Sequence, residues 1–205
     1  QPFRSRIGRR NLSEGVNGFL KDRIGPEKAI VLFMGRKTRY KGADLILKAA
    51  PKVWEKQKDV VFVFAGPDTE YSKNLFSGIE DTRILMLPEL TEKEKASALS
   101  ECDIFCMPSS EESLGGVYIE AWSVGKPVIA LDIPPVREMM DGEESGCLTR
   151  EDPDDLADKL LRLIENPSLA AGMAQKGRQI VSERFDWDGI ASRMEAFYQE
   201  LTGRR

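Results

Sequence analysis

Four cationic residues lie close together in a short loop that follows the first strongly apolar run of the chain. The loop reads Gly35-Arg36-Lys37-Thr38-Arg39-Tyr40-Lys41-Gly42 and directly precedes an amphipathic stretch. Arg36 can present a forked guanidinium to phosphate oxygens and Lys41 a point charge, while the N-terminus of the next helix adds partial positive charge. The loop predicts an anion site. Taken alone, it leaves a solvated run of surface charge open as the alternative.

A second loop combines carboxylates with glycines. It reads Ser109-Ser110-Glu111-Glu112-Ser113-Leu114-Gly115-Gly116-Val117, and Glu120 follows on a helix predicted to begin near Gly116. The glycines let the backbone approach a ligand, and the amides of the first helical turn have no intrahelical acceptor. Carboxylates such as Glu112 and Glu120 can accept hydrogen bonds from sugar hydroxyls. This loop therefore predicts a ligand that is both polyol and anion, whereas Glu111 is interpreted as a solvated loop charge.

These loops need a scaffold, and the alternation of apolar and amphipathic stretches supplies one. Apolar runs of four to six residues cover 29–34, 60–65, 84–87, 104–107 and 127–131. They are apolar on both faces, as buried parallel strands are. Helices are predicted over 42–56, 91–101, 152–165, 168–183 and 187–201, with caps at Thr91 and Asp152. The pattern predicts one α/β domain with a doubly wound parallel sheet, which binds ligands where its strands end.

The domain is expected to span 29–205. Residues 1–28 carry glycine and proline breakers and are predicted to be an irregular segment, the remnant of an interdomain linker. Three cysteines, Cys102, Cys106 and Cys147, are interpreted as core thiols of a reduced, cytoplasmic protein. Trp122 and the pair Met139-Met140 are likewise expected to pack in the core.

Composition excludes several functional classes. The 205 residues are 41% hydrophobic and 31% charged with a net charge of −4, which argues against a disordered chain and against a strongly basic nucleic-acid binder. No apolar run reaches the roughly 18 residues of a transmembrane helix. The chain has no histidine, so Ser–His and Cys–His nucleophiles and His-bearing zinc sites are excluded for this chain alone.

Other phosphate-binding fingerprints are absent from the sequence. Neither G-x-x-x-x-G-K-[ST] nor G-x-G-x-x-G follows the first predicted strand, which excludes P-loop and dinucleotide-binding proteins. A flavodoxin-like regulator needs an acidic cluster where the strands end, and the basic loop 35–42 opposes it. No Asp-x-Asp lies on a strand-end loop near the anion site, so no metal and no cofactor is expected.

Several of these segments resemble one family. P-S-x-x-E-S-x-G-x-x-x-x-E-A at 108–121, followed by G-K-P-V-I-A at 125–130, resembles the retaining nucleotide-sugar glycosyltransferases of family 4, the group 1 transferases. G-R-x-x-x-x-K-G-x-D at 35–44 is similar to their diphosphate-binding loop. The resemblance covers roughly residues 30–201, with departures at Pro88, where the family usually has glycine, and at Leu114, which replaces the commoner phenylalanine.

The resemblance implies the donor-binding, C-terminal half of a GT-B fold, in which two Rossmann-like domains face each other across a catalytic cleft. It implies that Arg36 and Lys41 neutralise the donor diphosphate without a metal and that Glu112 binds hydroxyls of the donor sugar; these are the expected catalytic residues. Glu120 would bind the ribose, and the backbone around Leu90 the base. The further donor-binding residues that the resemblance implies are Gly35, Ser113, Leu114, Gly115, Gly116 and Val117.

The expected function is therefore transfer of a hexose from a UDP-, GDP- or ADP-sugar to a glycan or lipid-linked acceptor. The family's N-terminal domain has no counterpart in residues 1–28, so the chain alone is expected to bind donor without transferring it. The full-length enzyme is expected to be cytoplasmic or peripheral to the membrane. The alternative is a non-catalytic nucleotide-binding or interaction module on the same scaffold.

Overall fold

The protein has a six-stranded, all-parallel sheet. The computed structural model describes residues 18–140 and 142–203. Its strands run in the order β3-β2-β1-β4-β5-β6, and every neighbouring pair is parallel. Their bounds are β1 Ala29–Met34, β2 Val60–Ala65, β3 Ile84–Leu87, β4 Ile104–Met107, β5 Val128–Leu131 and β6 Gly146–Thr149. The predicted doubly wound α/β fold is thus confirmed, and β6 is a strand that the sequence analysis did not identify.

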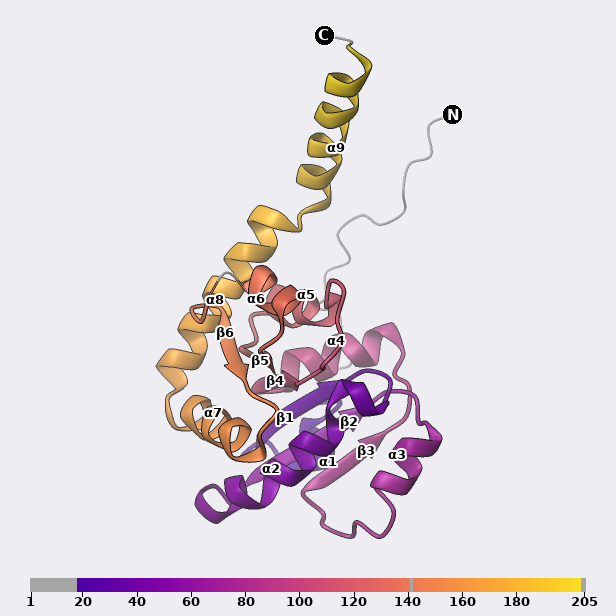
Figure 1. Cartoon of the computed structure of the whole chain (residues 1–205). Helices are drawn as coiled ribbons and strands as arrows, with labels where there is room; N and C mark the ends of the chain where they lie inside the picture. Colours follow the sequence, from indigo (N-terminus) through magenta and orange to yellow (C-terminus); the bar gives the residue numbers. More distant parts are fainter. Residues whose placement is uncertain (1–17, 141, 204–205) are drawn as a thin grey trace.

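Helices cover both faces of this sheet (Figure 1). Helix α2 packs against α7 on one side, and α5 packs against α8 on the other. The helices are α1 Lys21–Ile24, α2 Ala43–Lys56, α3 Glu70–Leu75, α4 Glu92–Glu101, α5 Gly116–Ser123, α6 Pro134–Met140, α7 Pro153–Glu165, α8 Pro167–Arg184 and α9 Trp187–Thr202, with a 3₁₀ turn η1 at Arg39–Lys41. Strand order reverses between β1 and β4, which is the switch point where such sheets bind ligands.

Local sequence signals explain where the helices begin. Thr91 and Glu94 form the predicted capping box of α4, and the Asp152 carboxylate accepts the amide of Asp154 at the start of α7. All three cysteines are free and buried, as expected of core thiols. Trp122 is also fully buried, and its indole donates to the Ser145 carbonyl. The core is therefore assembled from the apolar runs that the sequence pattern identified.

The segment before β1 differs from the prediction. Residues 1–17 lie outside the described part of the chain, but residues 18–24 form a turn and helix α1 rather than an irregular linker. Phe19 and Leu20 are buried in the core. The Glu101 carboxylate accepts hydrogen bonds from the backbone amides of Phe19, Leu20 and Lys21, at 3.0, 2.8 and 2.9 Å. The prediction of an irregular segment is wrong here because a contact across about 80 residues of sequence orders these residues.

Replacing Glu101 is expected to destabilise the domain in a pH-dependent way. Burial alone would raise the pKa of Glu101, but hydrogen bonds from the Ser97 hydroxyl and the three amides outweigh it and lower the pKa. A lowered pKa in the folded state stabilises the protein above the ordinary glutamate value of about 4.3, and that stabilisation is lost as the pH falls through the folded-state value. We expect Glu101→Gln to lower the free energy of unfolding by about 1–3 kcal/mol at pH 7. Urea unfolding at pH 7 and pH 3.5 measures the difference, which should shrink at the lower pH; an equal difference at both would contradict it.

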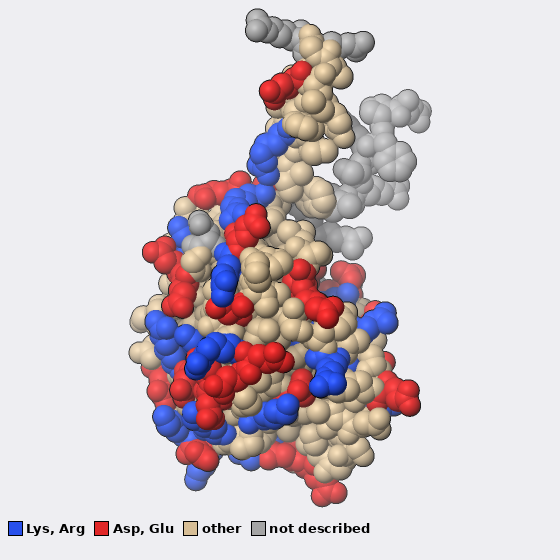
Figure 2. All heavy atoms as spheres, viewed as in Figure 1, with Lys and Arg blue, Asp and Glu red and all other residues tan. Residues whose placement is uncertain are grey.

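Helix α9 projects away from the rest of the domain (Figure 1). None of its residues is buried, and Trp187 and Leu201 are 71% and 67% exposed. Figure 2 shows acidic and basic side chains intermingled over the visible face of the body, whereas the projecting helix is largely uncharged. Exposed apolar side chains thus gather on this helix, whereas scattered single ones are usual on protein surfaces.

Candidate functional site

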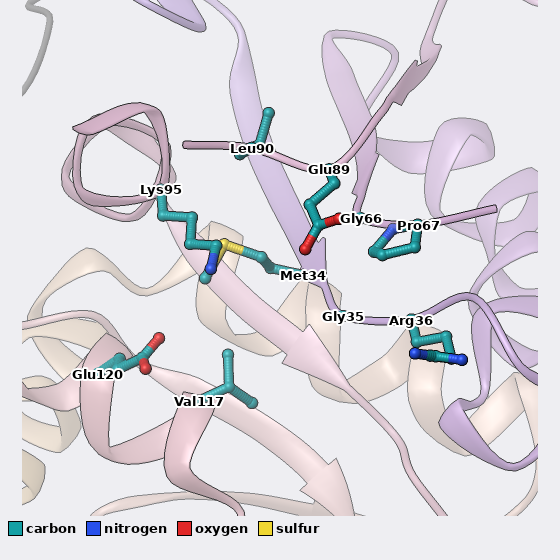
Figure 3. Close-up of a pocket in the computed structure, with 10 residues that line it drawn as sticks. All are labelled: Met34, Gly35, Arg36, Gly66, Pro67, Glu89, Leu90, Lys95, Val117 and Glu120. Carbon is teal, nitrogen blue, oxygen red and sulfur yellow. The ribbon is translucent and has the colours of Figure 1, made fainter. Parts of the chain in front are cut away.

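A cavity opens at the carboxyl edge of the sheet, the edge at which the strands end. It encloses about 310 Å³ between the loops that follow β1, β2 and β3 and the first turns of α4 and α5 (Figure 3). We call it the inner cavity. It is lined by Met34, Gly35, Arg36, Gly66, Pro67, Glu89, Leu90, Lys95, Val117 and Glu120.

A second, more open depression lies beside the turn before α5. This outer hollow encloses about 650 Å³ and is lined by Tyr40, Lys41, Ser110, Glu111, Glu112, Ser113, Ile133, Pro134 and Pro135. The structure therefore divides the predicted site residues into two groups. Gly35, Arg36, Leu90, Val117 and Glu120 line the inner cavity, whereas Lys41, Glu112 and Ser113 line the outer hollow. Leu114, Gly115 and Gly116 form the connecting turn, and the Leu114 side chain is 56% exposed.

Glycines let the two loops meet. Gly42 has φ +78°, and a Cβ there would lie 2.2 Å from the carbonyl oxygen of Pro108. Gly115 has φ +66°, and a Cβ there would lie 2.5 Å from the ring of Tyr118. The Ser110 amide donates to the Tyr40 carbonyl at 2.8 Å, which joins the loop after β4 to the loop after β1. A side chain at position 42 would push the loop after β1 away from Pro108, and one at position 115 would collide with Tyr118 in the helix that follows this turn.

Lys41 and Glu112 are in direct contact. The Lys41 Nζ atom lies 2.5 Å from Glu112 Oε1, with the two side chains 18% and 9% exposed. The ring of Tyr40 lies 5.3 Å from the same ammonium, close enough for a cation–π contact. Residues 71 positions apart in sequence thus form one charged pair at the wall of the outer hollow. The ammonium of this pair can bind an anion, and the carboxylate beside it can accept a hydrogen bond from a neighbouring hydroxyl group of the ligand.

Lys37 does not take part in the anion site that the cationic loop predicted. Its side chain is 1% exposed, and its ammonium lies 2.8 Å from Asp68 Oδ1 and donates to the Leu87 carbonyl at 2.8 Å. Arg39 faces a separate hollow that Glu151 also lines. Of the four cations in this loop, the sequence analysis assigned only Arg36 and Lys41 to the anion, and the structure places Lys37 and Arg39 elsewhere. Arg36 alone reaches the inner cavity, because successive residues after the strand point to different sides.

We expect Lys37→Met to lower the free energy of unfolding by about 1–3 kcal/mol, because the loops after β1, β2 and β3 lose the ammonium that joins them. Methionine keeps the apolar stem, so packing is conserved. Urea unfolding measures the change, with Lys58→Met at an exposed loop position as the control, expected within about 0.5 kcal/mol of the native chain. Equal effects of the two substitutions would refute this role for Lys37.

Glu120 shares the inner cavity with charges that the sequence analysis did not select. Reduced hydration raises the pKa of Glu120 although part of its side chain stays in solvent, and the nearby Lys95 ammonium partly opposes that rise. Glu89 lies at the same cavity, beside Leu90. Both new residues lie near Leu90 in sequence, but Glu92, Lys93 and Glu94 lie there too, and only the cavity separates Glu89 and Lys95 from them.

The inner cavity also receives the start of helix α5. The Gly116 and Val117 amides belong to its first turn and have no intrahelical acceptor. Tyr118 fixes this turn to the sheet, because its buried hydroxyl donates to the Met107 carbonyl at 2.6 Å. With Arg36 opposite, the arrangement presents free N–H groups and a guanidinium to one space, which suits an anion such as phosphate.

The fold and these strand-end loops define a Rossmann-like α/β domain with a charged ligand cavity at its switch point. A family model described as glycosyl transferases group 1 matches residues 19–180. The chain belongs to this family of glycosyl transferases, which confirms the resemblance seen in the sequence.

A relative in sequence agrees with this assignment, and solved structures share the fold. A phosphatidyl-myo-inositol mannosyltransferase of Mycobacterium tuberculosis is 32% identical over 180 residues, which cover 84% of this chain and 47% of the relative. The C-terminal domain of a group 1 family protein, LpcC from Francisella tularensis, has a TM-score of 0.71 at 23% identity, covering 82% of this chain and 91% of that chain. A TarM variant from S. aureus, solved with UDP among its ligands, has a TM-score of 0.73 at 25% identity and matches 82% of this chain and 35% of that chain. The chain spans about half the length of the mycobacterial relatives it matches.

Proposed function

We propose that this chain is the donor-binding domain of a retaining glycosyltransferase that transfers a hexose from a nucleotide-diphosphate sugar to a glycan or lipid-linked acceptor. The observation that carries the proposal is that the two depressions lie at the two ends of one turn, with Ser113 at the outer hollow and Val117 at the inner cavity. The inner cavity offers Leu90 and Glu120 to a nucleoside, the outer hollow offers Glu112 to a sugar, and cations lie in both. The UDP bound to the TarM variant supports a nucleotide in this fold.

In this proposal Arg36 and Lys41 neutralise the diphosphate. Arg36 acts from the inner cavity and Lys41 from the outer hollow, so that the two phosphates would lie along the turn before α5. The backbone amides of Gly35 and of residues 113–117 would bind phosphate and sugar. Glu120 accepts the ribose hydroxyls, and the backbone around Leu90 contacts the base.

The proposed reaction depends on charge stabilisation of the leaving group. As the bond between the anomeric carbon and the phosphate lengthens, positive charge grows on the sugar ring and negative charge on the phosphate. Fixed cations stabilise that phosphate, and a carboxylate beside the sugar fixes its orientation. We propose that no metal is needed, because Arg36 and Lys41 supply the positive charge.

We also propose that a second domain completes the enzyme. The relatives are about twice as long as the matched region, and α9 carries apolar side chains that nothing covers within the described residues. No helix in the described part of the chain is long and apolar enough to cross a membrane. A cytoplasmic location, peripheral to the membrane where the acceptor is lipid-linked, agrees with three free buried thiols.

The two glutamates are expected to respond differently to substitution. Glu120→Ala should lower the affinity for free nucleotide and for nucleotide sugar alike, by about tenfold, because both ligands carry the ribose. Glu112→Gln should leave the affinity for the free nucleotide unchanged and lower only the affinity for the nucleotide sugar. Calorimetric titration of each variant with UDP, GDP and ADP and with their glucose conjugates is the measurement. Equal losses for both kinds of ligand in both variants would show that the assigned roles are mistaken.

A further inference from the structure

Two charged side chains of opposite sign point into the inner cavity. Glu89 comes from the loop after β3 and Lys95 from the first turn of α4, on either side of the buried Leu90 (Figure 3). The proposed function gives neither residue a role. In Figure 3 Lys95 lies across the cavity from Arg36, with the Glu89 carboxylate between them, so a nucleotide whose phosphates approach Arg36 would direct its base toward Glu89 and Lys95.

The structure holds Lys95 in place. The Thr91 amide donates to Glu94 at 2.8 Å in the capping box that begins α4, and Lys95 Nζ lies 3.0 Å from Glu92 Oε1. The side chain of Lys95 is 35% exposed. A hydrogen bond to Glu92 is the main cause that raises the pKa of Lys95, and the charges of Glu120 and Glu89 add to it, so Lys95 remains a cation.

The Glu89 carboxylate, by contrast, is available to bind a ligand. Within residues 18–140 and 142–203 its carboxylate has no hydrogen-bond or ion-pair partner, and the side chain is directed into the cavity. An ionised carboxylate accepts hydrogen bonds and donates none, whereas an ammonium only donates. The pair therefore presents two acceptor oxygens and a separate donor group to whatever base enters.

Nucleobases differ in how well they match this pair. Guanine carries N1–H and the 2-amino group side by side, with the O6 acceptor next to them, so a carboxylate can accept two hydrogen bonds while an ammonium donates to O6. Uracil places its single N3–H between two carbonyl oxygens, which a carboxylate repels. Adenine has only its 6-amino donors, next to a ring nitrogen that accepts. Guanine is the base whose edge satisfies both charged groups.

We propose that Glu89 and Lys95 recognise guanine, so that the donor of this site is a guanosine-diphosphate sugar. This inference rests on the proposed function, since it requires a nucleotide in the inner cavity. The cavity volume of about 310 Å³ is near the lower end of small-ligand pockets. It suits the nucleoside part, while the diphosphate and sugar extend to Lys41 and the outer hollow.

Calorimetric titration of the chain with GDP, UDP, ADP and inosine diphosphate tests the proposal. Inosine diphosphate lacks only the 2-amino group of GDP, and therefore one of the two donors assigned to Glu89. We expect GDP to bind at least about tenfold tighter than the other three. In Glu89→Gln the affinity for GDP should fall about tenfold, and the difference between GDP and inosine diphosphate should disappear. Lys95→Met should lower the affinity for GDP by a similar factor.

Glu55→Gln and Lys56→Met are the matched controls, because α2 ends there at the opposite edge of the sheet and both side chains are exposed. They should leave every affinity unchanged, and thermal melting of all four variants verifies that they fold. UDP or ADP binding as tightly as GDP, or a Glu89→Gln variant that still distinguishes GDP from inosine diphosphate, would overturn the guanine assignment and leave the proposed function standing. Failure of all four diphosphates to bind would overturn both.

Discussion

Arg36→Ala and Lys41→Ala are each expected to weaken binding of a nucleoside diphosphate by roughly tenfold to a hundredfold. A charge-assisted hydrogen bond to phosphate contributes about 1.5–3 kcal/mol, and each 1.4 kcal/mol is a factor of about ten in affinity. Lys41→Ala should have the larger effect, because the Glu112 carboxylate, only 9% exposed, would remain unpaired beside the bound phosphates. Adding Glu112→Gln to Lys41→Ala should restore part of the loss by removing that repulsion.

Isothermal titration calorimetry with the free diphosphates is the measurement for these variants. Arg39→Ala is the control, since this exposed cation belongs to the same loop but lines a different hollow together with Glu151. Its affinities should match those of the native chain, which separates direct contact with phosphate from a general loss of positive charge. If Arg36→Ala and Lys41→Ala also bound as the native chain does, the phosphate assignment would fail.

The second large effect concerns turnover. We expect the 205-residue chain to bind nucleotide sugar and yet to transfer no hexose to an acceptor. Transfer needs an acceptor hydroxyl within about 3–3.5 Å of the anomeric carbon, in a cleft that excludes water. The outer hollow, where the sugar would lie, is the larger and more open of the two depressions, so solvent reaches it. Slow hydrolysis of the donor is compatible with this, because the cations still stabilise the departing phosphate.

Release of nucleotide from a panel of nucleotide sugars, with and without acceptors, measures this prediction. The assay compares this chain with the longer protein that we propose it belongs to. Acceptor-dependent release should be at least about a thousandfold faster in the longer protein. Acceptor-dependent turnover by this chain alone would overturn the two-domain proposal, whereas tight donor binding without turnover in either protein would favour the non-catalytic nucleotide-binding module.

The sequence by itself determined the architecture, because the signals for it are local. A strand such as 60–65 is apolar on both faces, which is favourable only where helices cover both sides of its sheet. The alternation of such runs with amphipathic stretches therefore predicts a parallel, doubly wound sheet. The caps at Thr91 and Asp152 depend on residues two or three positions away and are confirmed. Strand β6 was missed because Gly146–Thr149, with a glycine and a threonine at its ends, is not a continuous apolar run. Helix α1 was missed because the Glu101 carboxylate that holds its first residue lies 80 positions away in sequence.

Only the tertiary structure decided how the charged residues divide. Arg36, Lys37 and Lys41 are cations of one loop, of which the sequence analysis assigned Arg36 and Lys41 to phosphate. The structure places Arg36 at the inner cavity, buries Lys37 against Asp68, and pairs Lys41 with a carboxylate 71 residues away. Strand order brings the loops after β1, β3 and β4 to one edge, and side-chain direction then selects which charges meet. The role of a charged residue depends on the partner that it meets across the fold, and the spacing of residues along the chain does not specify that partner. Glu89 and Lys95 therefore became candidates only once the cavity between these loops was visible.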